Sequence, residues 1–143
     1  MLFSWILIMW QMFFITIWLF KNRPEPYWGG NWTEMRGLAD VSPIPCHSHN
    51  DYWRDNPLYS ALRVGCIGIE ADVWLLEDEL YVGHNKREIT YGRTFSSLYI
   101  NPIVEILESR ERLSNSTEYG IFEADSRQTL ILVVDIKTDG PQT

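Results

Sequence analysis

Apolar residues along the chain alternate between strand-like runs and helix-like runs. From residue 43 onward, three apolar runs predict strands, and two amphipathic runs between them predict helices. The expected strands are 44–48, 67–75 and 130–136, with a short hairpin strand at 80–83, and the expected helices are 56–64 and 101–113. Strand, helix, strand, helix, strand is the order typical of parallel α/β architecture. The run LILVVDI at 130–136 is nearly all apolar, which predicts a parallel strand buried on both faces.

Both expected helices open with the same Asn-Pro pair. Asn56 is expected to cap the first helix, and Pro57 fits its first turn, where a missing N–H costs nothing. Gly65 is expected to end this helix. Asn101 begins the second helical run in the same way.

The first twenty residues form a separate apolar segment. Residues 1–20 contain no charged residue, and as a helix they would span roughly 30 Å, enough to cross the hydrocarbon core of a bilayer. We expect a single-pass membrane anchor. The alternative is a cleaved signal peptide on a secreted protein. No basic residue precedes the run and no small-residue cleavage pattern follows it, which favours the anchor.

Two signals near the expected anchor disagree about membrane orientation. Lys21 and Arg23 directly follow the apolar segment, which favours a cytoplasmic carboxyl side. The glycosylation sequons NWT at 31–33 and NST at 115–117 have meaning only in the secretory lumen. The orientation is therefore left open.

The charge balance disfavours one class of partner. The chain has 12 basic and 19 acidic residues, and residues 1–23 contribute two of the basic ones and no acidic one. The remainder, with 10 basic and 19 acidic residues, has a net charge of −9. A field of this sign repels nucleic acid, so we expect no nucleic-acid partner. An anionic substrate would have to be held by a metal or by a few well-placed cations.

The chain has two cysteines, Cys46 and Cys66. They could pair in an oxidising compartment, but two free buried thiols are the expectation. No CxxC spacing indicates a zinc site.

Residues suited to metal and acid–base chemistry stand at the ends of the expected strands. Glu70 and Asp72 are two positions apart on a strand, so their carboxylates share a face. Asp135 and Lys137 share a face in the same way at the end of the last strand. Close carboxylates repel unless a cation or a shared proton neutralises them, and oxygen ligands of this kind suit Mg²⁺ or Ca²⁺. The carboxyl ends of parallel strands are where catalytic groups gather in α/β proteins.

The three histidines, His47, His49 and His84, fall at the ends of the same strands. Taken alone, each signal is weak, because a histidine near a strand end is usually structural and an ExD pair usually lies on a solvated edge. Their shared placement at one edge of a parallel sheet favours a functional site.

Four motifs together resemble a known superfamily. The segments SHNDYW, ALRVGCIGIEADVWL, LYVGH and LILVVDIKTDG are similar in order and spacing to phospholipase-C-like phosphodiesterases of the glycerophosphodiester phosphodiesterase kind. The resemblance is strongest to the group called altered inheritance of mitochondria protein 6, and it covers roughly residues 43–140. It implies an α/β fold of the TIM-type (β/α)8 barrel class, of which this chain would supply about three of the eight parallel strands.

The resemblance also implies the roles of individual residues. His49 and His84 would be catalytic, one as general base and the other as general acid, with the assignment left open. Lys137 would face the substrate phosphate. A divalent metal, Mg²⁺ or Ca²⁺, would be held by three carboxylates, those of Glu70, Asp72 and Asp135.

Two positions depart from the pattern of glycerophosphodiesterases. The third metal ligand is usually Glu in that family and is the shorter Asp135 here, which leaves the metal distance or identity open. The Arg-Gly pair after the first histidine is replaced by Asn50 and Asp51, so one phosphate-contacting cation is missing and substrate choice does not transfer. His47 has no counterpart and is expected to support the site or the fold.

The expected organisation is an anchor at 1–20, a linker at 21–42 and a partial phosphodiesterase barrel at 43–143. The expected function is that of a metal-dependent phosphoric diester hydrolase acting on a lipid-derived or glycerol phosphodiester. Three strands cannot close a barrel, so the chain is expected to be an amino-terminal fragment that is inactive by itself. The alternative is a non-catalytic, membrane-anchored remnant that binds a divalent ion or a partner. The oligomeric state is left open.

Overall fold

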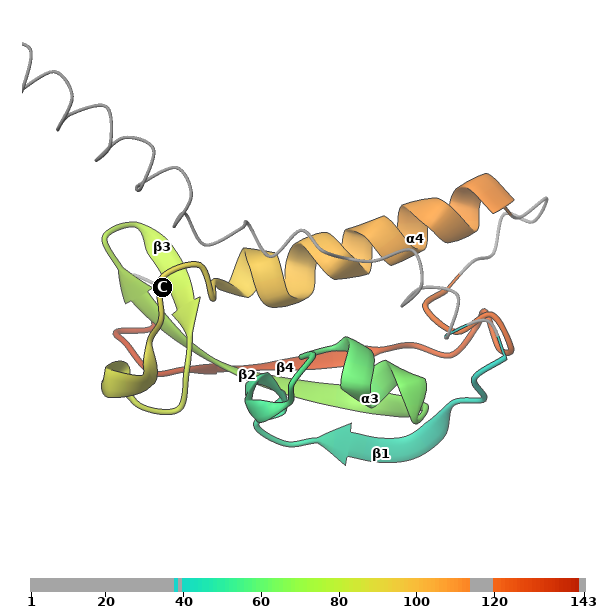
Figure 1. Ribbon diagram of the computed structural model, residues 1–143, viewed down its shortest axis with the longest axis horizontal. Helices are drawn as coiled ribbons and strands as arrows, with labels where there is room; N and C mark the ends of the chain where they lie inside the picture. Colours follow the sequence, from blue (N-terminus) through green and yellow to red (C-terminus); the bar gives the residue numbers. More distant parts are fainter. Residues whose placement is uncertain (1–37, 39, 114–119, 142–143) are drawn as a thin grey trace, which may run out of the picture.

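The computed structural model describes residues 38, 40–113 and 120–141. Its central feature is a sheet made of the strands β1 (Ile44–Ser48), β2 (Cys66–Leu76), β3 (Glu79–Val82) and β4 (Ile131–Ile136). β2 pairs in parallel with both β1 and β4, and β3 folds back antiparallel onto the end of β2 (Figure 1). The predicted α/β class with three parallel strands is confirmed, and each strand lies within one residue of its predicted bounds.

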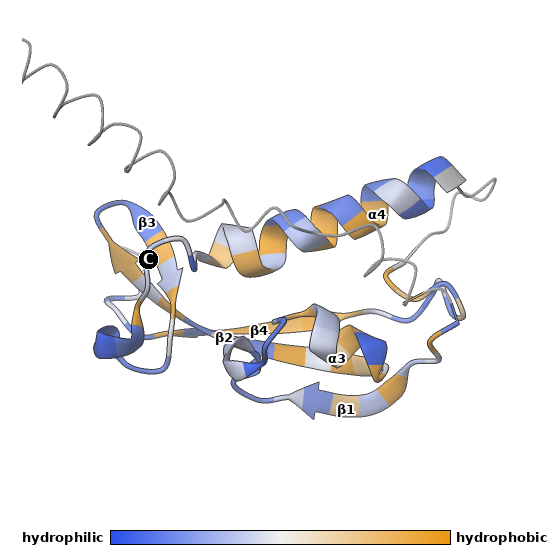
Figure 2. Ribbon diagram, in the orientation of Figure 1, coloured by the Kyte–Doolittle hydropathy of each residue, from blue (hydrophilic) through white to orange (hydrophobic). Residues whose placement is uncertain are grey.

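Helices cover one face of this sheet. α3 (Tyr59–Arg63) and α4 (Asn101–Leu113) lie on the same side of the strands (Figure 1). Ile69, Ala71 and Val73 of β2 point into the core between sheet and helices and are almost completely buried. Burial of an Ile or Val side chain contributes about 1.5–3 kcal/mol, so this row of β2 anchors the core. Figure 2 shows apolar residues in the strands and on the side of α4 that faces them.

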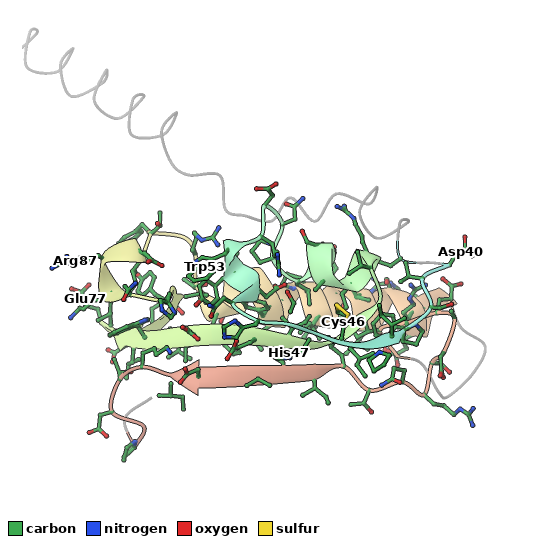
Figure 3. The ribbon with its side chains drawn as sticks, turned by 90° about the horizontal axis from the view of Figure 1, so that it is seen from below. Asp40, Cys46, His47, Trp53, Glu77 and Arg87 are labelled. Atoms are coloured by element: carbon green, nitrogen blue, oxygen red, sulfur yellow. A yellow bond between two sulfur atoms is a disulfide. The ribbon has the colours of Figure 1, made fainter. Side chains whose placement is uncertain are left out.

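The opposite face of the sheet carries the alternate residues of β2, Gly68, Glu70 and Asp72, and we call it the open face. In parallel pairing, partner residues share a face, and Glu70 pairs with Val133 while Asp72 pairs with Asp135. Neither α3 nor α4 covers this face, which Figure 3 shows from the side away from α4. Glu70 and Asp72, which are predicted to carry chemistry, therefore stand on the same face of the sheet, with side chains that are 16% and 2% exposed.

The first helix begins three residues later than predicted. Leu58, not Asn56, stands at the helix start, with a positive φ of 65°, and its N–H donates to Asp51 Oδ2 at 2.6 Å. Asn56 and Pro57 form a turn ahead of α3, in which Ser60 N–H donates to the carbonyl of Asn56. A hydrogen bond to the buried carboxylate of Asp51, seven residues earlier in the chain, thus overrides the local Asn-Pro signal.

The second helix, α4, has its predicted bounds, Asn101–Leu113, but Asn101 does not cap it. A π-helical turn, η3 (Ser96–Ile100), leads directly into α4, so Asn101 lies inside a continuous helix and does not cap it. The start signal is a reciprocal pair, in which Ser97 N–H donates to Thr94 Oγ1 and Thr94 N–H donates to Ser97 Oγ, both at 3.0 Å. This is the bonding logic of a capping box with serine in place of the usual acid.

The expectation that the last strand is buried on both faces is wrong for the described chain. Leu132 packs against the core, but four other apolar residues of β4 are between 40% and 54% exposed: Ile131, Val133, Val134 and Ile136. The physical reason is that β4 pairs only with β2, and among the described residues no strand pairs with its outer edge.

The predicted anchor at 1–20, nearly all of the predicted linker and both glycosylation sequons lie outside the described residues. Within the part of the chain that the structure describes, no helix has the length and apolar character needed to cross a membrane.

Cys46 of β1 and Cys66 of β2 form a disulfide, so the expectation of two free thiols is wrong. The two residues are 20 positions apart in sequence, but parallel pairing of β1 and β2 brings their Cα atoms to 4.7 Å. A register shift between Ile44 and His47 places the disulfide just before the polar end of β1.

Reduction of the Cys46–Cys66 disulfide should lower the free energy of unfolding by about 3 kcal/mol, because the cross-link restricts the unfolded chain. Denaturant unfolding with and without dithiothreitol measures this difference. The double variant Cys46→Ser/Cys66→Ser should match the reduced protein and should not respond to reductant. Equal stability of the oxidised and reduced protein would contradict the expectation.

Candidate active site

Asp72 is the centre of the candidate site. It lies on the open face near the carboxyl end of β2, yet its side chain is only 2% exposed. Its Oδ2 atom accepts from Tyr52 Oη at 2.9 Å and contacts His84 Nδ1 and Lys137 Nζ, each at 3.1 Å. Buried carboxylates need such donors, because an unpaired buried charge is costly. Three separate segments of the chain therefore meet at one oxygen atom.

Lys137 connects Asp72 to Asp135 on the neighbouring strand. β2–β4 pairing places Asp135 opposite Asp72, and the Lys137 ammonium lies between them, 2.5 Å from Asp135 Oδ2. The hydrogen bond to Asp135, reinforced by Asp72, raises the pKa of Lys137. The lysine backbone is fixed as well, because its N–H donates to the carbonyl of Val73 at 2.9 Å. The carboxylates of Asp72 and Asp135 therefore both contact one cation, the Lys137 ammonium.

His49 forms a second pair with Glu70 on the same face. His49 Nε2 lies 3.3 Å from Glu70 Oε2, and the imidazole is largely exposed. The same carboxylate oxygen accepts from the backbone N–H of Asn50 at 3.1 Å. Asn50 adopts a left-handed conformation with φ 48° and ψ 48°, which asparagine tolerates better than most residues. Glu70 therefore holds both the first histidine and the turn that follows it.

Asp51 fixes the loop that carries His49, and sequence analysis missed this role. It is fully buried and accepts from Ser48 Oγ at 2.7 Å and from Leu58 N–H at 2.6 Å. Burial raises the pKa of Tyr99, and the neighbouring Asp51 carboxylate raises it further. In the sequence, Asp51 stood out only as part of the Asn50-Asp51 pair that replaces Arg-Gly. Nothing in the local sequence shows that its carboxylate has hydrogen-bond partners on both sides of a turn.

Tyr52 is the second residue that sequence analysis missed. Its ring is 3% exposed, and its hydroxyl lies 2.8 Å from Asn50 Oδ1, 2.9 Å from Asp72 Oδ2 and 3.4 Å from His84 Nδ1. Burial, followed by the hydrogen bond to Asp72, raises the pKa of Tyr52, so the phenol remains protonated and acts as a donor. The sequence signal for Tyr52 was its place in the SHNDYW segment, three residues after His49. No spacing rule assigns a role to a tyrosine at that position.

Trp53 forms an aromatic rim beside the second histidine. Its side chain, labelled in Figure 3, is 60% exposed. Its ring centroid lies 5.3 Å from that of His84 and 5.7 Å from that of Tyr52. Hydrogen bonds from Asn85 and then from Trp53 lower the pKa of Glu88, which follows His84 in the chain. A large exposed aromatic side chain held in this way presents an apolar edge next to the polar cluster.

The structure brings the sequence-predicted residues together in two adjacent groups. One group joins Asp72, His84, Lys137 and Asp135, and the other joins His49 to Glu70. His47 belongs to neither group and packs over Gly68, where an added Cβ would stand only 2.6 Å from His47 Nδ1. The glycine is required for this close approach.

The arrangement of the carboxylates bears on metal binding. Across residues 38, 40–113 and 120–141, no three His, Cys, Asp or Glu side chains converge closely enough to hold a metal ion together. Asp72 and Asp135 nevertheless converge on the Lys137 ammonium, and Glu70 stands on the same face of β2. The donor set is made of carboxylate oxygens, which are the ligands that Mg²⁺ and Ca²⁺ prefer.

The AIM6-like phosphodiesterase domain family matches residues 35–143 of the chain. An altered inheritance of mitochondria protein 6 homolog from Arthroderma benhamiae is 48% identical over 110 residues, which cover 70% of this chain and 35% of the relative. The proteins named altered inheritance of mitochondria protein 6 from Lachancea thermotolerans and Saccharomyces cerevisiae are 42% and 38% identical, over 73% and 70% of this chain. The resemblance found in the sequence is confirmed.

The chain spans 35%, 26% and 27% of the length of these three curated relatives. No solved structure is significantly similar to the chain.

Stability at high pH should depend on Tyr52. Its pKa is raised in the folded state above the unfolded value of about 10, so its contribution is fully present below about pH 10 and is lost as the pH rises further. Denaturant unfolding between pH 9 and pH 12 should therefore show a shallower loss of stability in Tyr52→Phe than in the wild type. Tyr91→Phe, at an exposed position, is the control and should follow the wild type. Identical slopes for all three proteins would refute the assignment.

Proposed function

Because the chain belongs to the AIM6-like phosphodiesterase domain family, we propose that it forms part of a metal-dependent phosphoric diester hydrolase acting on a lipid-derived or glycerol phosphodiester. The observation that carries the proposal is the convergence of Tyr52, His84 and Lys137 on Asp72. The His49–Glu70 pair stands on the same face. Two histidines beside a cation-binding pair of carboxylates suit cleavage of an anionic diester.

The two histidines would carry the proton transfers. One would take a proton from the attacking hydroxyl, which is water or a neighbouring hydroxyl of the substrate, and the other would protonate the leaving oxygen. An imidazole suits both roles, because its unperturbed pKa lies near neutrality. His84 Nδ1 faces the Asp72 carboxylate, which only accepts, so that nitrogen carries a hydrogen and Nε2 is left for the substrate.

Glu70, Asp72 and Asp135 would hold a divalent cation, Mg²⁺ or Ca²⁺. Such an ion, when bound, neutralises the phosphate and stabilises the charge that develops on its oxygens. The Lys137 ammonium lies between two of these carboxylates, so an ion that takes this position must displace it. Lys137, once displaced, would remain on the open face and could pair with a phosphate oxygen.

The disulfide and the sequons support a proposal about location. We propose that the domain folds in an oxidising compartment, held at the membrane by residues 1–20 or secreted after their removal. Disulfides persist in secretory compartments and are rare in the cytosol, and the Cys46–Cys66 bond links two strands of the site.

The exposed Trp53 beside His84 is compatible with a substrate that has an apolar part.

His49→Ala and His84→Ala should each reduce kcat by about 10²- to 10⁴-fold, because each removes a proton-transfer group. The measurement is hydrolysis of bis(p-nitrophenyl) phosphate and glycerophosphocholine by the full-length natural protein, with and without chelator. His47→Ala is the matched control and should retain most of the turnover. Turnover that survives both substitutions, or that ignores chelator, would contradict the proposal. Metal binding without any turnover would favour the non-catalytic alternative.

Lys137→Met should tighten binding of the divalent metal by about tenfold, because it removes a cation that competes for the same carboxylates, an interaction of 1–4 kcal/mol at 4 Å. Calorimetric titration with Ca²⁺ and Mg²⁺ measures the change. Lys86→Met removes the same charge from an exposed position and serves as the control. Equal or weaker metal binding in Lys137→Met would argue against a shared position for the ammonium and the metal.

A further inference from the structure

We propose that Tyr52 is a positioning residue, whose buried hydroxyl holds Asp72 so that His84 keeps its Nδ1 protonated and its Nε2 directed at the substrate. This inference rests on the proposed phosphodiesterase function and adds a residue that the family resemblance does not assign. Tyr52 itself touches neither substrate nor reacting atoms in this scheme.

The surroundings of the hydroxyl are those of a site residue. The hydroxyl has three polar neighbours within 3.4 Å, on Asn50, Asp72 and His84. Asp72 and His84 belong to the candidate site, and Asn50 lies in the turn that Glu70 holds. The ring is held by burial and by an edge contact with Trp53, and Arg93 donates to the backbone carbonyl of Tyr52 at 2.5 Å. The position of the hydroxyl is therefore fixed independently of its polar partners.

Counting hydrogens fixes the direction of each bond. The phenol has one hydrogen, and the carboxylate of Asp72 is a stronger acceptor than the amide oxygen of Asn50. Of the two acceptors within reach, Asp72 Oδ2 at 2.9 Å and Asn50 Oδ1 at 2.8 Å, Tyr52 therefore donates to the carboxylate. His84 Nδ1 lies 3.1 Å from Asp72 Oδ2 and 3.4 Å from the phenol, so its hydrogen also goes to the carboxylate.

Tyr52 links the two segments that carry the proposed catalytic histidines. It lies in the short 3-10 helix η1 (Asp51–Trp53), directly after the turn that carries His49. Its hydroxyl reaches the partner of His84, which follows β3. Without the hydroxyl, Asp72 Oδ2 would lose one of the three contacts that orient it, and the carboxylate could rotate away from His84.

The consequence for His84 is specific. Its imidazole is partly exposed and lies tilted beside the Trp53 ring, so the carboxylate determines which ring nitrogen carries the hydrogen. If Asp72 rotates away, the ring can exchange between its two neutral tautomers. A fraction of the molecules would then present an N–H where the reaction needs a free nitrogen.

The test compares Tyr52→Phe with the exposed control Tyr91→Phe in the natural protein. Phenylalanine keeps the buried ring, so the variant should fold, which near-ultraviolet circular dichroism checks. We expect kcat to fall about 10- to 100-fold with KM within about twofold of the wild type, as is usual when a partner of a site residue is lost. Long-range ¹H–¹⁵N spectra of His84 should show the Nδ1–H tautomer in the wild type and a mixture in Tyr52→Phe.

The two measurements separate this inference from the function it rests on. An unchanged His84 spectrum in Tyr52→Phe overturns the positioning role, whatever the turnover. A fall in kcat with an unchanged spectrum also overturns it, because the loss would then have another cause. If the wild type hydrolyses no phosphodiester, the proposed function fails, while a changed His84 spectrum still supports the link from Tyr52 to His84. Wild-type behaviour of Tyr91→Phe is required in every case.

Discussion

The buried carboxylate of Asp72 is the constraint on which the site depends. A charge placed near the centre of a sheet costs several kcal/mol unless donors surround it, and a hydrogen bond to a charged group returns about 1.5–3 kcal/mol. In this chain the donors come from the turn after β1, the loop after β3 and the end of β4. Satisfying one oxygen atom therefore requires the segments that carry the predicted chemistry to assemble around it.

A second buried carboxylate, that of Asp51, holds the turn after β1 from the side of the core. It bonds to Ser48 at the end of β1 and to Leu58 at the start of α3, and so connects the strand to the helix layer. Asp51 and Asp72 flank the segment that contains His49, one toward the core and one toward the open face. The loop is thus held from both sides by charge-assisted hydrogen bonds, which leaves the His49 imidazole as its exposed element.

Much of this arrangement could be predicted from sequence, because the strands follow a period of two. That period placed Glu70 and Asp72 on one face, and it placed Asp135 and Lys137 at the matching end of β4. The missing parts depend on contacts between distant segments. No local pattern shows that Asp51 reaches Leu58, that Tyr52 reaches Asp72, or that Cys46 meets Cys66.

The same limit explains why the start of the first helix was predicted three residues too early and why the turn ahead of the second helix was missed. At Leu58 a carboxylate from another segment decides where the chain turns, and at Thr94 a reciprocal pair with Ser97 starts the helix before Asn101. For β4, the apolar sequence predicted burial on both faces, and this was wrong because burial also needs covering partners. The described chain supplies such a partner along one edge of the strand only.

Amide hydrogen exchange in Asp72→Asn tests most directly whether this carboxylate holds the site together. The amide keeps the shape of the side chain but removes the charge, so Trp53 N–H, bonded to Asn50, and Lys137 N–H, bonded to Val73, should exchange about tenfold faster or more. Leu62 N–H, bonded to Leu58 in α3, is the internal reference and should be unchanged. Unaltered exchange at Trp53 and Lys137 would contradict the account, because the two segments would then be held without Asp72.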